Sequence, residues 1–192
     1  MQDRIILGVD PGTLIMGFAV IRQKGKSNTL LSCDVLKLKH IEDHSLRLKM
    51  IFDKLTEVID EFKPTEMAIE APFFGKNVQS MLKLGRAQGV AIASAMNSGL
   101  KIFEYSPKKI KQSITSNGNA SKEQVAEMLK QLLKLESMPK YFDASDAMGV
   151  AVCHSFQFMP LEGAPAGVRK KKISKKASSW AVYLSQNPDR KA

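Results

Sequence analysis

The chain has 192 residues, of which 44% are hydrophobic and 25% are charged. These values are typical of a folded domain, and they exclude a disordered, collagen-like or disulfide-scaffold protein. Lysine and arginine outnumber aspartate and glutamate by 29 to 19, so the formal net charge is +10 at neutral pH. Such an excess favours a polyanionic partner, either nucleic acid or an acidic membrane surface, without indicating a fold.

The first third of the chain predicts three consecutive strands, because its apolar runs are short and rich in β-branched residues. These runs cover residues 4–9, 18–22 and 30–38. A helix should follow and continue to about Phe62, with Ser45 as its N-cap and Pro64 after its end. The next apolar run, residues 67–69, predicts a short buried strand.

The second half alternates predicted helices and strands, which is typical of an α/β sheet. The expected elements are a helix over 78–97, a strand over 101–105, and helices over 122–133 and 142–158. Ser121 and Gln124 have the spacing of a capping box at the start of the second of these helices. Residues 163–192 hold eight lysine and arginine residues and one acidic residue. We therefore expect a folded domain over 1–160 and a basic, flexible tail over 161–192.

The cysteines and the apolar runs indicate the compartment. Cys33 and Cys153 belong to no Cys-x-x-Cys or Cys/His cluster, so we expect neither a zinc site nor a secreted disulfide framework. The apolar run over residues 5–9 is too short for a signal peptide or a membrane span. We expect a cytoplasmic protein that does not act at a membrane.

Four carboxylates lie at the ends of predicted elements. Asp10 follows the first strand directly before a Pro-Gly turn, and Glu70 ends the short buried strand before Pro72. Asp143 and Asp146 are three residues apart, which places both on one face of the last helix. Each acid alone is compatible with a turn former or with an ordinary acidic helix start. These local roles explain the presence of all four acids together less well than they explain each acid alone.

If these segments converge, their carboxylates would repel one another unless cations neutralised them. A donor set of oxygens, without thiolate or paired imidazole, favours Mg²⁺ or Mn²⁺ over zinc. Two such ions can activate a water molecule and stabilise the leaving oxygen during attack on a phosphodiester. His154 has no place in this mechanism, because a lone histidine in an apolar helix is more commonly structural.

The pattern resembles the RuvC-type Holliday junction resolvases of the ribonuclease H-like superfamily over residues 4–158. The matching motifs cover residues 8–12, 68–73, 76–77, 82–85, 117–118 with Lys122, and 143–147. The resemblance implies an α/β fold with a mixed five-stranded sheet flanked by helices. It assigns catalysis and metal binding to Asp10, Glu70, Asp143 and Asp146, with two Mg²⁺ ions per subunit and Mn²⁺ able to substitute.

The resemblance also implies a set of DNA contacts. These are Phe73, Phe74, Lys76, Lys111 and Lys122. Phe73 matches the family's residue that stacks at the open centre of a junction, and Lys111 and Lys122 match its DNA-contacting lysines. Ser116 departs from the family pattern, which often has glycine there, so we expect a change in loop geometry that keeps both lysines.

The long helix over 78–97 carries the residues expected at a dimer interface, namely Leu82, Gly85 and Gly89. Two glycines within a helix suggest a close approach, either to the chain's own sheet or to another subunit. In the family this helix builds the dimer, and a two-fold pair of sites suits a nearly symmetric junction. The resemblance thus implies a homodimer that binds four-way junction DNA and works with a branch-migration motor of the RuvA and RuvB type.

We therefore expect a structure-selective endonuclease that resolves four-way DNA junctions by paired, symmetric hydrolysis in recombination and repair. Three alternatives remain. A sugar-kinase or actin-type ATPase begins with a similar strand and turn, although this chain is short for the two lobes such a protein needs. A nuclease acting on structured RNA would use the same acids. A non-catalytic DNA-binding protein would use the acids only as caps and turn formers.

Overall fold

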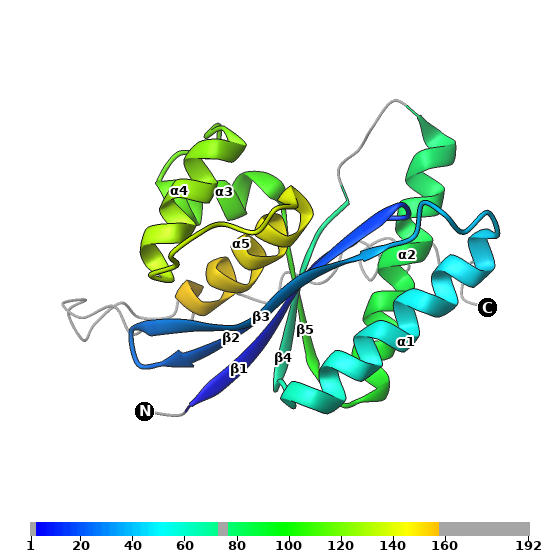
Figure 1. Cartoon of the computed structure of the whole chain (residues 1–192), viewed down its shortest axis with the longest axis horizontal. Helices are drawn as coiled ribbons and strands as arrows, with labels where there is room; N and C mark the ends of the chain where they lie inside the picture. The colour runs from blue at the N-terminus through cyan, green and yellow to red at the C-terminus, as the bar shows by residue number, and fades with distance from the viewer. Residues whose placement is uncertain (1–2, 73–76, 158–192) are drawn as a thin grey trace, which may run out of the picture. The chain divides into compact units, whose positions relative to one another are not determined.

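The computed structural model describes residues 3–72 and 77–157, and within them five strands form one sheet with helices on both faces (Figure 1). The strands are β1 (Arg4–Asp10), β2 (Ile15–Lys24), β3 (Ser27–Lys37), β4 (Glu66–Glu70) and β5 (Lys101–Tyr105). The helices are α1 (His44–Phe62), α2 (Val78–Asn97), α3 (Pro107–Thr115), α4 (Lys122–Leu132) and α5 (Phe142–Gln157). The expected tail over 161–192 lies outside the described residues, so the division into two parts stays a prediction.

The sheet is mixed, with strand order β3-β2-β1-β4-β5. Tight connections join β1 to β2 and β2 to β3, and both pairs are antiparallel. Helices α1 and α2 return the chain across the sheet, so that β4 runs parallel to β1 and β5 runs parallel to β4. The mixed five-stranded sheet expected from the sequence is confirmed. Strands β2 and β3 are longer than predicted, because a turn of only Gly25 and Lys26 separates them.

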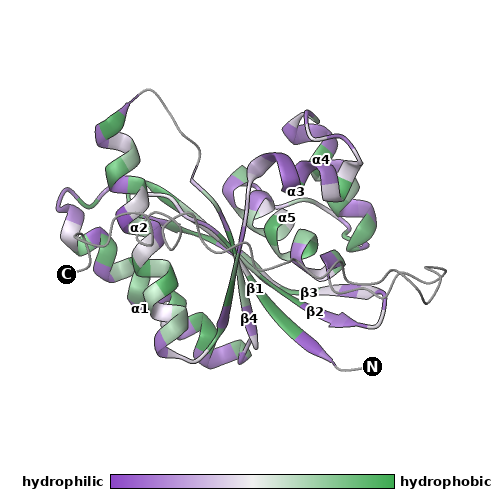
Figure 2. Ribbon diagram, turned by 180° about the vertical axis from the view of Figure 1, so that it is seen from behind, coloured by the Kyte–Doolittle hydropathy of each residue, from purple (hydrophilic) through white to green (hydrophobic). Residues whose placement is uncertain are grey.

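Strand β1 contributes to both hydrophobic cores, because successive side chains of a strand face opposite sides of the sheet. Ile6 packs in the core formed with α3, α4 and α5, whereas Leu7 and Val9 pack in the core formed with α1 and α2. Figure 2 shows hydrophobic residues along β1 and around α5. Helix α5 is buried over most of its length, which makes it the central helix of its layer.

The helix starts confirm one expected cap and correct another. At α4, Ser121 Oγ accepts a hydrogen bond from the Gln124 backbone N–H, and Gln124 Oε1 accepts one from the Ser121 N–H. This is the capping box expected from the sequence. The expected cap of α1 was wrong: Asp43 is the N-cap, and its carboxylate accepts from the N–H groups of Ser45 and Leu46. A carboxylate is favoured there because its charge also interacts with the positive end of the helix.

Helix α3 was not predicted from the sequence, because its three lysines leave only a short apolar pattern. Ser106 caps it, Pro107 occupies its first turn, and Ile110 and Ile114 are buried in the core with α5. The helix ends at Ser116, whose φ of 62° lies in the left-handed region. Glycine adopts this conformation without steric cost, and Ser116 adopts it here despite its side chain.

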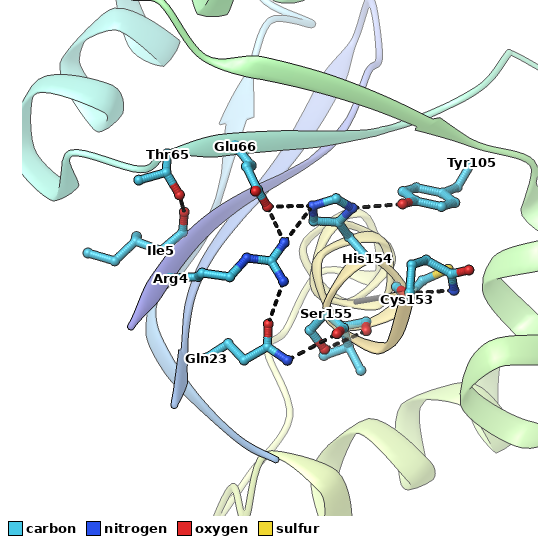
Figure 3. A network of polar contacts seen from close by, with 11 residues as sticks. Arg4, Ile5, Gln23, Thr65, Glu66, Tyr105, Cys153, His154 and Ser155 are labelled. Carbon is cyan, nitrogen blue, oxygen red and sulfur yellow. Dashed lines mark hydrogen bonds and ion pairs between the residues drawn. The ribbon is translucent and has the colours of Figure 1, made fainter. Parts of the chain in front are cut away.

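A buried polar network joins α5 to the sheet (Figure 3). His154 is fully buried, with Nε2 2.7 Å from Glu66 Oε2 and Nδ1 2.7 Å from the Tyr105 hydroxyl. Arg4 forms an ion pair with the same Glu66 carboxylate and donates to Gln23 Oε1 at 3.0 Å. Burial lowers the pKa of His154, so the ring is neutral, donates from Nε2 to Glu66 and accepts from Tyr105 at Nδ1. The expected structural role of this histidine is confirmed.

Tyr105→Phe should lower the free energy of unfolding by about 1–3 kcal/mol, because it leaves the buried Nδ1 of His154 without its donor. Urea denaturation of the full chain measures this change. The matched control is Tyr141→Phe, which removes a hydroxyl on the surface of the protein and should change stability by less than about 0.5 kcal/mol. Equal effects of the two substitutions would contradict a stabilising role for the Tyr105–His154 hydrogen bond.

Candidate active site

The four expected carboxylates come from three elements that meet at one edge of the sheet. Asp10 ends β1 and Glu70 ends β4. The two strands are parallel neighbours in which Val9 pairs with Ile69, so the acids that follow these residues leave the sheet side by side. Asp143 and Asp146 lie in the first two turns of α5, which packs across β1 and β2. The structure therefore brings together residues separated by up to 136 positions in the sequence.

Two glycines set the position of α5 on the sheet. A Cβ atom at Gly8 would lie 2.3 Å from the Ala147 carbonyl oxygen, and one at Gly17 would lie 1.9 Å from the Asp143 carbonyl oxygen. No larger residue fits at either position unless the helix moves away. Gly17 also pairs with Asp10 across β1 and β2, so the start of α5 lies over the strand end that carries Asp10. The role of Gly17 was not predicted from the sequence, although a glycine within an apolar strand often marks such an approach.

Burial, together with the charges of the neighbouring acids, raises the pKa of two of these carboxyl groups. Burial raises the pKa of Asp10 to about 8, with further contributions from Glu70, Asp146 and Asp143. Burial, followed by the charge of Asp146, raises the pKa of Glu70 to about 7, and the nearby Lys122 acts in the opposite direction. The site therefore opposes the ionisation of its own carboxylates unless positive charge is supplied.

Two lysines supply part of that charge. Lys122 Nζ lies 2.6 Å from Asp146 Oδ2, and Lys111 Nζ donates to the Ala120 carbonyl at 2.8 Å. Both lysines line a cavity of about 220 Å³, and Glu70 and Asp146 line the same cavity. Two of the three lysines that were expected from the sequence to contact DNA, Lys111 and Lys122, are thus beside the carboxylates. A phosphate in this cavity would lie near both the lysine ammonium groups and the carboxylates.

The donor set fits a hard divalent cation, because the clustered side chains offer carboxylate oxygens and no thiolate. Among residues 3–72 and 77–157, no three acidic, histidine or cysteine side chains already stand in a ligating arrangement. Asp146 instead pairs with Lys122. Binding of an ion would therefore require the carboxylates to turn toward it and Asp146 to exchange its lysine partner.

The remaining expected site residues fall into two groups, the DNA contacts before α2 and the dimer residues of α2. Three expected DNA contacts lie outside the described residues and so stay predictions, namely Phe73, Phe74 and Lys76. Leu82 is 54% exposed on α2. A Cβ atom at Gly85 or Gly89 would meet no atom within 4 Å, so these glycines do not approach any described part of the chain. A close approach of these glycines to the chain's own sheet is therefore excluded for the described residues, and an approach to another subunit stays a prediction.

Comparison with known proteins agrees with this arrangement. The family described as crossover junction endodeoxyribonuclease RuvC matches residues 6–154. The crossover junction endodeoxyribonuclease RuvC of Cytophaga hutchinsonii is 53% identical over 188 residues, which cover 98% of this chain and 88% of that protein. The protein of the same name from Porphyromonas gingivalis is 49% identical over 191 residues, covering 98% and 97% of the two chains.

Solved structures give the same result for the fold. The structure of Thermus thermophilus RuvC in complex with a Holliday junction substrate superposes with a TM-score of 0.76 at 31% sequence identity. The superposition covers 80% of this chain and 94% of that one. Because the family match spans most of the chain and the relatives are similar over nearly all of it, this chain belongs to the RuvC family of crossover junction endodeoxyribonucleases.

Proposed function

We propose that this protein is a structure-selective endonuclease that cuts DNA at four-way junctions during recombination and repair. The observation that carries the proposal is the meeting of Asp10, Glu70 and Asp146 beside Lys111 and Lys122, in a chain that belongs to the RuvC family. The Thermus thermophilus relative is described in complex with a Holliday junction substrate. The same substrate is proposed here for this chain.

The proposed cofactor is Mg²⁺, with two ions per subunit and with Mn²⁺ able to replace it. Asp10, Glu70, Asp143 and Asp146 would hold the ions, whose positive charge would offset the burial and the repulsion that raise the pKa of Asp10. When bound, the ions would activate a water molecule and stabilise the leaving oxygen of the phosphodiester. Lys122, once it has released Asp146, is close enough to the acids to neutralise the charge of the phosphate.

The proposal includes a homodimer formed through α2. This helix leaves several large apolar side chains exposed, namely Val78 at 66%, Leu82 at 54% and Met96 at 64%. The open positions at Gly85 and Gly89 would let a second helix approach closely. A two-fold pair of sites could then cut two strands at related positions of a nearly symmetric junction.

The proposed setting is the bacterial cytoplasm, where a branch-migration motor of the RuvA and RuvB type would present the junction. None of the helices in the described part of the chain is long and apolar enough to cross a membrane. The basic residues over 163–192 would add to the affinity for DNA through phosphate contacts.

Asp146→Asn should reduce cleavage of a labelled synthetic four-way junction by at least about 100-fold in Mg²⁺, because it removes a proposed metal ligand. Binding of the junction should be retained, since the lysines of the site remain. Single-turnover cleavage assays and fluorescence anisotropy measure the two quantities, with a matched duplex and a structured RNA as further substrates. Asp53→Asn is the control, because Asp53 also pairs with a lysine but lies on the exposed face of α1.

Cleavage by Asp146→Asn at the wild-type rate would remove Asp146 from the mechanism. Cleavage of the structured RNA in preference to the junction would instead identify a ribonuclease. Binding of the junction by the wild-type protein, without cleavage of any substrate in Mg²⁺ or Mn²⁺, would identify an architectural protein.

The Asp10 carboxyl gives a prediction about pH in the absence of divalent ions. The unfolded chain ionises Asp10 near its ordinary pKa of 3.8, whereas the folded chain keeps the proton up to about pH 8. The folded state therefore binds more protons, and wild-type stability should fall as pH rises between these values. Asp10→Asn removes this loss. As pH rises, the free energy of unfolding of the variant should therefore increase relative to that of the wild type, by at most about 1.4 kcal/mol per pH unit.

Urea unfolding in EDTA at about pH 5 and about pH 8 measures this difference between Asp10→Asn and the wild type. Asp53→Asn is the control, because Asp53 lies on the exposed face of α1 and is not one of the clustered acids. Addition of Mn²⁺ at the higher pH should stabilise the wild type more than Asp10→Asn. A pH-independent difference for Asp10→Asn would show that Asp10 does not carry a raised pKa in the folded chain.

The dimer gives a third test of the proposed function. Leu82→Glu should raise the dissociation constant of the dimer by at least about tenfold, because it would bury an unpaired charge between two α2 helices. Sedimentation velocity over a range of protein concentrations measures this change. Leu46→Glu is the control, since Leu46 is comparably exposed at 46% but lies on α1. A wild-type protein that stays monomeric throughout would exclude the dimer.

A further inference from the structure

Two aromatic residues that the mechanism does not use lie directly beside the acids. Phe142 is the first residue of α5 and precedes Asp143, and its side chain is 53% exposed. The residue before it, Tyr141, is also on the surface. A single exposed aromatic side chain is common in proteins. Here, however, the exposed Phe142 follows the half-buried Tyr141 and directly precedes Asp143, one of the clustered acids.

Each of these rings has a lysine ammonium group over its face. Lys122 Nζ lies 5.9 Å from the centre of the Phe142 ring, and the same atom binds Asp146. Lys37 Nζ lies 4.6 Å from the centre of the Tyr141 ring and also bonds to its hydroxyl. The lysines come from α4 and β3, so three separate segments build this surface. Cations over aromatic faces stabilise the position of both groups.

The sheet topology places this surface at the active-site edge. Lys37 ends β3 and pairs with Ile15 at the start of β2, whereas Asp10 ends β1 and pairs with Gly17 of the same strand. Along this edge the order is therefore Glu70 on β4, Asp10 on β1, and then Lys37 on β3. The start of α5 lies over β2, between Asp10 and Lys37. The aromatic pair thus flanks the acids on the side opposite to Glu70.

The chemistry of this surface matches a single strand of nucleic acid better than a protein partner. Exposed lysines surround the rings, namely Lys37, Lys122 and Lys140, and Asp34 is an acidic group that acts on Lys37. An apolar protein interface would instead be depleted in charge at its centre. Alternating aromatic and basic side chains are typical of surfaces on which bases stack while lysines bind the phosphates.

We propose that Phe142, supported by Tyr141, is a stacking position for an unpaired base of the strand that is cut, with Lys37 and Lys140 contacting its phosphates. The base lies on the β2–β3 side of the carboxylates. This inference rests on the proposed junction-cutting function. It adds a DNA subsite on the opposite side of Asp10 from Glu70.

The test compares three substitutions at Phe142 in the full chain. Phe142→Ala should raise the dissociation constant for a four-way junction by about 5- to 100-fold, as expected for the loss of one stacked base. Phe142→Leu keeps an apolar side chain without a π face and should show most of the same loss, whereas Phe142→Trp should bind as well as the wild type. Leu132→Ala, on the exposed end of α4, is the control. The affinity for an intact duplex should not change with any of these substitutions.

A second measurement separates stacking from a structural effect on Lys122. If Phe142 contacts the base, Phe142→Ala should weaken binding while the single-turnover cleavage rate at saturating protein stays within about threefold of the wild type. A normal dissociation constant combined with a reduced saturating rate would mean that Phe142 acts through Lys122 and would overturn the proposal. Wild-type affinity of Phe142→Leu, or an equal loss on duplex DNA, would overturn it as well.

The proposed function and this subsite fail in different ways. A wild-type protein that does not cut junctions would refute the proposed function. A wild-type protein that cuts junctions, together with a Phe142→Ala variant that binds and cuts them equally well, would refute only the stacking position. Lys37→Ala should also lower the dependence of log Kd on log salt concentration by about one unit, as expected for one lost phosphate contact. An unchanged salt dependence would remove Lys37 from the subsite.

Discussion

The close approach of α5 to the strands β1 and β2 is the constraint on which the site depends. Without side chains at Gly8 and Gly17, the helix backbone lies against the sheet, and the carbonyl of Asp143 takes the space of a Cβ atom. The acids at the start of α5 are thereby held near Asp10, and their mutual repulsion cannot be relieved by movement of the helix. Buried apolar side chains along α5 stabilise this arrangement. The packing energy of the core therefore maintains an electrostatically unfavourable site.

Such a site is a favourable place for a cation, because neutralisation relieves a repulsion that the fold has already imposed. In the described structure Lys122 partly fills this role through its bond to Asp146. A lysine is a mobile point charge, so it can transfer its interaction from a carboxylate to a phosphate with little rearrangement. Helix α4 holds the backbone of Lys122 through its capping box. The capped helix start thus fixes the position of the Lys122 backbone, while the flexible side chain can move its charge between the two partners.

The sequence predicts the strands and the acids well, because both depend on local patterns. Apolar runs with an acid at their end identify Asp10 and Glu70 without any knowledge of the neighbouring strands. Helix α3 was missed because its lysines hide two buried isoleucines, Ile110 and Ile114, whose burial requires α5. The network of Arg4, Glu66 and His154 could not be predicted either, since its partners are 62 to 150 residues apart and no local pattern pairs them.

The two faces of the sheet differ in a way that bears on function. The face with α3, α4 and α5 carries the acids, the lysines and the polar network, so most of its groups are held by contacts within the chain. On the other face α2 buries a stripe of small residues against its own chain and exposes the surface with Leu82, Gly85 and Gly89. A second subunit bound there would not need to disturb the acids, because α2 and α5 lie on opposite faces of the sheet. Catalysis and assembly can therefore use the same fold without competing for the same residues.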